Sequence, residues 1–200
     1  MSSALIEFCE EKYVYNQYIY EFFNSVSNLF YLLVANKIYV NNGPMGGALV
    51  LVGAGSFLLH STGTFAGQLV DELSMVSLLN IVHCQLGEDI RTKILMGIST
   101  VIIMYLYYLL RLHWIFLAFF TFQVLAVMDV IFVLAVKNVV LSANFIKFLI
   151  LFTPAITAWA IEQHFCNYHK NFYLLHSVWH TLSALSLIYI SKIINAIKNE

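Results

Sequence analysis

His176 and His180, four positions apart near the end of the chain, are the first residues of this sequence whose spacing could support chemistry. In a helix, side chains at positions i and i+4 lie on one face, so both imidazoles could bind the same metal ion. Two histidines at a membrane interface would show the same spacing. The pair therefore indicates a metal site only if other ligands lie at the same level of the fold.

Ser56, His60 and Asp71 are polar residues in otherwise apolar surroundings. Ser56 and His60 again have the i, i+4 spacing of one helix face. Asp71 lies beyond a short turn, at the start of the next apolar segment, where it could also act as a helix cap. Three histidines with an open fourth position are typical of catalytic zinc sites, and no Cys₄ or Cys₂His₂ pattern competes. The residues therefore predict a catalytic zinc site.

The composition predicts that these residues belong to a membrane protein. Of the 200 residues, 60% are hydrophobic and 10% are charged, whereas an ordinary soluble domain is about 25% charged. The mean hydropathy is +0.79. A net charge of −1 gives no electrostatic support for binding nucleic acid. No linker rich in Pro, Gly or Ser interrupts the chain, so we expect one domain over residues 1–200.

Seven apolar segments predict membrane-spanning helices, because a helix needs about 20 apolar residues to cross a bilayer. Polar breaks such as 41–44, which contains Asn, Gly and Pro, separate the segments. The predicted fold class is an all-α integral membrane bundle of seven transmembrane helices. The expected spans are 18–39, 46–61, 69–86, 94–110, 114–136, 139–161 and 172–190.

Lysines and arginines predict the orientation of the bundle. Most lie at the span ends that share the side of the C-terminus, and only Lys12, Arg111 and Lys170 lie on the other side. The positive-inside rule then puts segment 1–17 in a lumen and tail 191–200 in the cytosol. The candidate metal and catalytic residues all fall near the lumenal side. The membrane could be that of the endoplasmic reticulum, the Golgi or another compartment.

The motifs around these residues resemble those of the alkaline ceramidase family. They occur in the family's order at 7–13 (EFCEEKY), 21–28 (EFFNSVSN), 55–60 (GSFLLH), 68–75 (QLVDELSM) and 176–180 (HSVWH). Residues 90–159 resemble the family in hydropathy alone. The wider superfamily, which includes adiponectin receptors, shares the Ser/His, Asp and paired-His scheme. The acidic N-terminal stretch and the segment 21–28 favour the ceramidase branch.

The resemblance implies a seven-helix zinc enzyme that hydrolyses the N-acyl amide of ceramides to a sphingoid base and a fatty acid. It assigns His60, His176 and His180 as zinc ligands, Ser56 and Asp71 as catalytic residues, and Trp179 as a neighbour of the substrate amide. Zinc would lower the pKa of a water to about 7. Asp71 would pass the water proton to the leaving amine, and Ser56 would stabilise the developing oxyanion.

The resemblance also implies a calcium site near the N-terminus. Its positions are Glu7, Phe8 (through its carbonyl), Glu10, Lys12 and Glu21. Lys12 departs from the family, which has an oxygen-bearing Asn there, because calcium takes six to eight oxygen ligands and an ammonium offers none. Either calcium binds despite Lys12, or the ammonium replaces the charge of the ion. A solvated acidic tail is the third interpretation.

A disulfide between Cys9 and Cys166 is also implied, because relatives appear to pair cysteines in these two segments. Both residues lie on the predicted lumenal side, where oxidising conditions permit the bond. Two free thiols are the alternative.

The remaining polar residues have no assigned chemistry. Asp129 is predicted to be a buried acid that could pair with a polar group across the bundle, although none is assigned. Glu162, His164 and His169 are predicted to lie solvated in a loop. The small polar residues of segment 21–28 are expected to form hydrogen bonds between helices, as is common in membranes.

Three other functions remain open. A receptor or sensor of the superfamily would carry the same zinc site with weak or no hydrolysis, and a related hydrolase could act on another lipid. A small-solute transporter could use intramembrane acids, although the two halves show no internal repeat. No obligate protein partner is evident. Product release from ceramide distinguishes the first alternative, and zinc dependence distinguishes the transporter.

Overall fold

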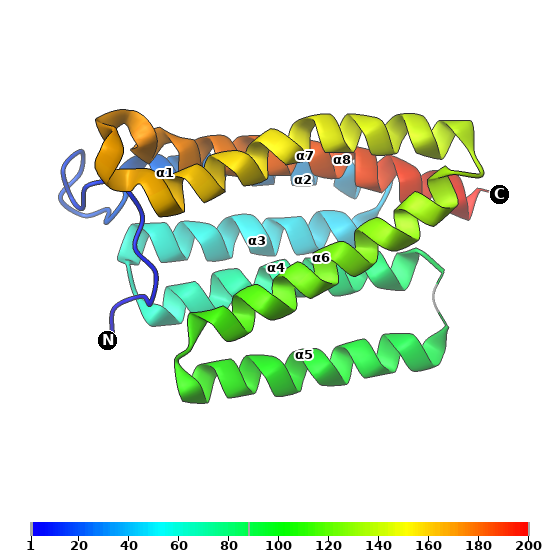
Figure 1. The fold of residues 1–200 in the computed structure, drawn as a ribbon, viewed down its shortest axis with the longest axis horizontal. Helices are drawn as coiled ribbons and strands as arrows, with labels where there is room; N and C mark the ends of the chain where they lie inside the picture. Colours follow the sequence, from blue (N-terminus) through cyan, green and yellow to red (C-terminus); the bar gives the residue numbers. More distant parts are fainter. Residues whose placement is uncertain (1, 88, 200) are drawn as a thin grey trace.

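The computed structural model describes residues 2–87 and 89–199, and most of them are helical (Figure 1). Met1, Glu88 and Glu200, which belong to the expected N-terminal segment, one polar break and the C-terminal tail, lie outside the described residues. The helices are α1 (Phe22–Ser27), α2 (Leu29–Tyr39), α3 (Gly43–Thr62), α4 (Phe65–Gln85), α5 (Ile90–Leu110), α6 (His113–Ala135), α7 (Val139–Phe165) and α8 (Leu174–Lys198), with 3-10 turns η1 (Cys166–Tyr168) and η2 (Lys170–Tyr173). The described residues contain no strand beyond one isolated bridge between Ser3 and Thr64, which confirms the all-α prediction.

Six helices within the described ranges, α3 to α8, are long and apolar enough to cross a membrane. The first expected span, 18–39, is instead divided into α1 and α2 at Asn28. The Asn28 side-chain amide donates to the Asn24 carbonyl at 2.8 Å, and such a bond competes with the regular helical pattern. The structure therefore confirms an all-helical fold with helices apolar enough to span a membrane, whereas a count of seven spans stays a proposal.

Most helices run along the long axis of the molecule, and α6 crosses them obliquely (Figure 1). Helix α3 packs against α4 and α2, and α8 packs against α7 and α2. The N-terminal segment, the α3–α4 turn and the α7–α8 connection share one end of the bundle, and the C-terminus lies at the other end. The candidate metal ligands belong to α3 and α8 near the first of these ends.

A two-residue turn joins α3 to α4 and holds the two helices close together. Gly63 ends α3 with a φ of 61°, a left-handed conformation that favours glycine. The Thr64 hydroxyl then caps α4 by accepting the Gly67 N–H at 3.2 Å. Further along, a Cβ added to Gly55 would lie 2.9 Å from the Asp71 Cα. Because Gly55 has no side chain, the backbone of α4 can lie close to α3 at Asp71. Ser56 follows Gly55 in the chain, so this contact brings Asp71 near Ser56.

We expect Gly55→Ala to destabilise the protein by about 1–3 kcal/mol, because the new methyl group meets backbone atoms that must move. Thermal unfolding in detergent measures the change. Gly47→Ala is the matched control, since it lies in the same helix with no atom within 4 Å of an added Cβ. Equal unfolding temperatures for the two variants would contradict the close α3–α4 contact.

The inward face of α6 shows why one expectation is wrong. Gln123, Val127 and Ile131 recur every four residues and are buried. Asp129 lies two positions from Val127, on another side of the helix, and it is exposed. The acid predicted to be buried therefore faces away from the core.

Candidate metal and catalytic site

Three buried histidines lie together where α3 ends and α8 begins. Each of His60, His176 and His180 offers one ring nitrogen, and these nitrogens lie within 4.8 Å of one another. Histidine nitrogens bind zinc at about 2.0–2.1 Å, so three such side chains can bind one ion between them. The structure brings the three predicted zinc ligands into one group.

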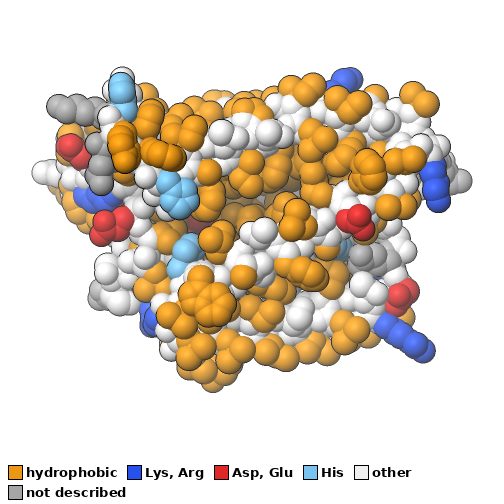
Figure 2. Space-filling view, viewed as in Figure 1, with side chains coloured by type: hydrophobic (Ala, Val, Ile, Leu, Met, Phe, Trp, Pro, Cys, Tyr) orange, Lys and Arg blue, Asp and Glu red, His pale blue; other side chains and the backbone are white. Residues whose placement is uncertain are grey.

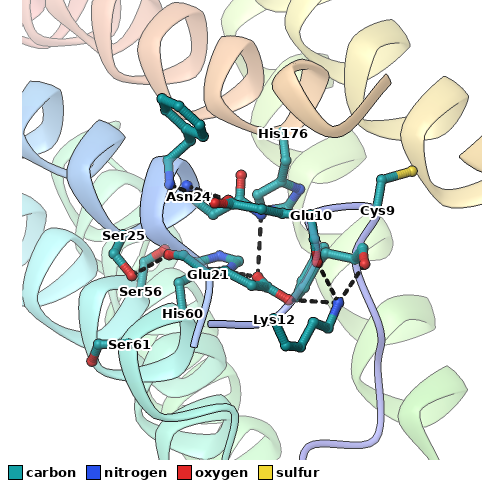
Figure 3. Close-up of polar contacts among 12 residues, drawn as sticks. Cys9, Glu10, Lys12, Glu21, Asn24, Ser25, Ser56, His60, Ser61 and His176 are labelled. Carbon is teal, nitrogen blue, oxygen red and sulfur yellow. Dashed lines mark hydrogen bonds and ion pairs between the residues drawn. The ribbon is translucent and has the colours of Figure 1, made fainter. Parts of the chain in front are cut away.

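An oxygen atom lies near the Nδ1 of each of these histidines, but a hydrogen bond forms only at His60 and His180, because His176 Nδ1 has no hydrogen-bond partner among the described residues. Metal-binding histidines usually have such an outer partner, because it fixes the orientation of the ring. The three pairs are His60 with Glu21 Oε2 at 2.7 Å, His180 with Ser27 Oγ at 2.8 Å, and His176 with Glu162 Oε2 at 3.6 Å. Figure 3 shows the Glu21 carboxylate next to His60.

The predicted catalytic residues lie beside the histidine group. Ser56 Oγ is 3.4 Å from His180 Nε2. Ser56 and Asp71 are both buried, and they line a cavity of about 110 Å³ together with His176, His180 and Trp179. A carboxylate, a hydroxyl, an indole and two of the imidazoles therefore border the same space, and a reacting group could meet all of them there.

A second, apolar cavity of about 90 Å³ lies next to this space. The two cavities share Tyr31, Val52, Met75, Phe120 and Trp179 as lining residues. Apolar side chains cover most of the face seen in Figure 2, which is hollowed between α7 and α6. The arrangement suits a ligand with a polar group at the histidines and a hydrocarbon chain beyond it.

The N-terminal segment covers the histidines from the end of the bundle. The Phe8 ring lies 4.7 Å from the His60 ring and 4.2 Å from the His176 ring, measured between centroids. Cys9 forms a disulfide with Cys166, with the two Cα atoms 5.3 Å apart, and the Cys9 N–H donates to Glu162 Oε1 at 2.5 Å. These contacts fix the segment in place.

The positions that the resemblance assigns to calcium surround an ammonium group. Lys12 Nζ donates to the Phe8 carbonyl at 2.6 Å and to the Glu10 carbonyl at 2.8 Å, and it lies 3.1 Å from Glu21 Oε1 (Figure 3). Glu7 is exposed. The centre of this group already holds a positive charge, so the residues present do not fit a calcium ion.

The Glu10 carboxylate points away from Lys12. It accepts the backbone N–H groups of Phe23 and Asn24 at 2.7 and 2.9 Å and so caps α1. Burial raises the pKa of this carboxyl, although the N–H groups of Asn24 and Phe23 act in the opposite direction. Its oxygens are therefore committed to the start of the first helix.

Glu162 corrects a second expectation from the sequence. It was predicted to be solvated in a loop, yet its exposed fraction is 0%. The reason is that α7 continues to Phe165, one turn beyond the expected end at 161, so Glu162 still faces the bundle. His164 and His169 are exposed, as predicted. A sequence prediction that extended this helix by one turn would have included Glu162 and could have placed it near His176.

A second group of polar side chains contains Glu72, which follows Asp71 in the chain, and two of its members, Glu72 and His113, line the cavity. Gln68 Nε2 donates to Glu72 Oε1 and to the Tyr107 hydroxyl, both at 2.9 Å, and His113 Nδ1 lies 3.1 Å from Glu72 Oε1. Glu72 and Gln68 belong to a motif noted in the sequence, but nothing near Tyr107 or His113 marks them. The group anchors α4 to α5 and α6 at the level of the site.

Comparison with known proteins relates the whole chain to one family. The family model described as Ceramidase matches residues 1–200. Alkaline ceramidase 1 of Mus musculus is 22% identical over an alignment of 222 positions, which covers 94% of this chain and 77% of that protein. Alkaline ceramidase YPC1 of Saccharomyces cerevisiae is 32% identical over 105 residues, which cover 48% of this chain and 33% of that one. Alkaline ceramidase 3 of Mus musculus is 29% identical over 116 residues, covering 53% and 43%.

Proposed function

This chain belongs to the ceramidase family and is an amide hydrolase, and from that premise we propose that it is a zinc-dependent membrane ceramidase. It would cleave the N-acyl amide of a ceramide and release a sphingoid base and a fatty acid. The observation that carries the proposal is the buried group of His60, His176 and His180. We further propose that residues 1–200 form one hydrolase domain.

The donor set fits zinc in its catalytic form. Three imidazoles, two of them hydrogen-bonded at Nδ1, leave room for a fourth ligand, whereas a structural site would be closed by four protein ligands. When bound there, zinc acts as a Lewis acid and lowers the pKa of a water from 15.7 to about 7. The remaining chemistry belongs to side chains around the cavity.

Asp71 is the proposed general base and general acid. Its carboxylate borders the cavity that the histidines also line, so it can take a proton from the attacking water and deliver it to the leaving nitrogen. The Ser56 hydroxyl, 3.4 Å from His180 Nε2, can donate a hydrogen bond to the developing oxyanion. Trp179 also lines this cavity, and its indole N–H can donate a hydrogen bond to the substrate amide.

The apolar cavity beyond the site supports a lipid substrate. A ceramide could keep its hydrocarbon in the space lined by Met75, Leu78 and Phe148 while its amide lies at the histidines. We propose that α1 and α2 together make the seventh crossing, with the N-terminal segment in a lumen and the C-terminus in the cytosol. The Cys9–Cys166 disulfide supports this orientation, because an oxidising lumen such as that of the endoplasmic reticulum or Golgi sustains such bonds.

Purified protein in detergent, incubated with a fluorescent short-chain ceramide, tests the function, and zinc content is measured on the same sample. We expect hydrolysis and about one zinc per chain. Zinc without hydrolysis of any ceramide would point to a receptor or sensor of the superfamily or to another lipid substrate. Folded protein with neither zinc nor activity would refute the metal proposal.

Glu162→Gln is expected to weaken zinc binding by roughly 10–100-fold, because outer partners of metal-bound histidines contribute on that scale. The amide keeps the shape of the side chain and removes the charge near His176 Nδ1. Zinc affinity is measured by competition with a chromophoric chelator. Glu11→Gln, at an exposed position of the N-terminal segment, is the control. Equal affinities in the two variants would exclude Glu162 from the support of the zinc site.

A further inference from the structure

We propose that the Lys12 ammonium is a built-in substitute for a dissociable cation, so that this protein neither binds nor requires calcium at its N-terminal acidic group. The contacts of Lys12 with Phe8, Glu10 and Glu21 carry the inference. The same contacts make Lys12 a positioning residue for His60.

The ammonium group is fully provided with acceptors. A lysine has three N–H donors, and Nζ has three oxygens within reach: the carbonyls of Phe8 and Glu10 and the carboxylate of Glu21, at 2.6, 2.8 and 3.1 Å. Two acceptors are backbone atoms of a segment held by the Cys9–Cys166 disulfide. The acceptors therefore hold the Lys12 side chain in one position, whereas a lysine on the surface samples many positions.

The same geometry leaves no place for calcium. Calcium needs six to eight oxygen ligands at about 2.3–2.6 Å. Here the carbonyls of Phe8 and Glu10 and one oxygen of Glu21 already face Nζ, and the Glu10 carboxylate is bound to the N–H groups of α1. An ion among these oxygens would also lie against the positive charge of Lys12. Calcium could enter only if the lysine left.

Glu21 links Lys12 to the histidine group, because its two carboxylate oxygens contact Lys12 and His60. One Glu21 oxygen lies by Lys12 Nζ, and the other lies 2.7 Å from His60 Nδ1 and accepts the Asn24 side-chain amide at 3.2 Å. The Glu21 side chain is only 2% exposed. Burying a carboxylate next to a positive charge costs less than burying it alone, so the Lys12 ammonium stabilises the position of the Glu21 side chain beside His60.

The inference rests on the proposed function in one respect, which is that His60 binds zinc. Calcium binding and zinc affinity can both be measured without turnover. Failure to hydrolyse ceramide would therefore count against the function alone, whereas the two metal measurements decide the role of Lys12.

Calcium titration by calorimetry, zinc competition and thermal unfolding test the proposal on the whole protein in detergent. The wild type is expected to give no calcium-binding heat and no change in unfolding temperature when calcium is added. Lys12→Met should weaken zinc binding by roughly tenfold, the lower end of the range for outer partners. Lys12→Asn, which supplies an amide oxygen in place of the charge, should bind one calcium and regain zinc affinity when calcium is added. Lys37→Met, at an exposed lysine of α2, is the matched control and should resemble the wild type.

Two results would overturn the proposal. One is stoichiometric calcium binding by the wild type with a rise in its unfolding temperature, a result that needs no variant to fold. The other is a zinc affinity of Lys12→Met equal to that of the wild type and of Lys37→Met.

Discussion

His180→Ala is expected to lower zinc affinity by more than about a hundredfold and to reduce ceramide hydrolysis to background. Loss of an outer partner alone costs 10–100-fold, and a direct ligand contributes more. His180 Nε2 also lies 3.4 Å from the Oγ of Ser56, a proposed catalytic residue. Removal of its ring therefore takes away a ligand and empties the centre of the site.

Zinc content and turnover of the fluorescent ceramide, measured on one preparation, check this expectation. His164→Ala is the matched control, because His164 is exposed on α7 and belongs to no proposed site. Circular dichroism of both variants confirms that the helices remain. Full zinc content in His180→Ala with normal turnover would exclude His180 as a ligand.

Asp71→Asn is expected to keep its zinc and to lose about 10²–10⁴-fold in the rate of hydrolysis, which is the usual contribution of a general acid–base group. Asn has nearly the same shape as Asp but cannot take the proton of the attacking water. Asp71 lines the cavity without belonging to the histidine group, so the metal should be retained.

The comparison of Asp71→Asn with Asp129→Asn separates catalysis from a general effect of removing an acid. Asp129 is exposed on α6, so its substitution should leave both zinc and rate unchanged. The rate at saturating substrate and the zinc content are the two readouts. A normal rate in Asp71→Asn would move the proton-transfer role to another group, of which Glu72 on the same cavity is the nearest in sequence.

The helices and the three histidines could be predicted because their signals are local. Apolar runs bounded by polar turns predicted most helix ends to within a few residues, as for α3, where Asn42 caps the start and Gly63 ends the helix. The spacing of His176 and His180 predicted a shared face. His60 lies at the end of its expected span that shares the membrane side of His176 and His180, so the three histidines were expected to lie together.

The outer partners of the site could not be predicted in the same way, because they depend on contacts between distant segments. Glu162 lies 3.6 Å from His176 Nδ1 only because α7 continues one turn past its expected end. Ser27 was expected to bond between helices, and the identity of its partner, His180, depends on how α1 lies against α8. Two of the Lys12 partners are main-chain carbonyls, which no side-chain pattern reveals.

The covering position of Phe8 has a consequence for the kinetics of the enzyme. This ring lies over His60 and His176 and the segment is tied down at Cys9, so the N-terminal segment covers the histidines at this end of the bundle. Under the proposed function, substrate then arrives by diffusion within the bilayer. The rate should follow the mole fraction of ceramide in the lipid surface, and adding inert detergent at constant total ceramide should slow the enzyme by surface dilution.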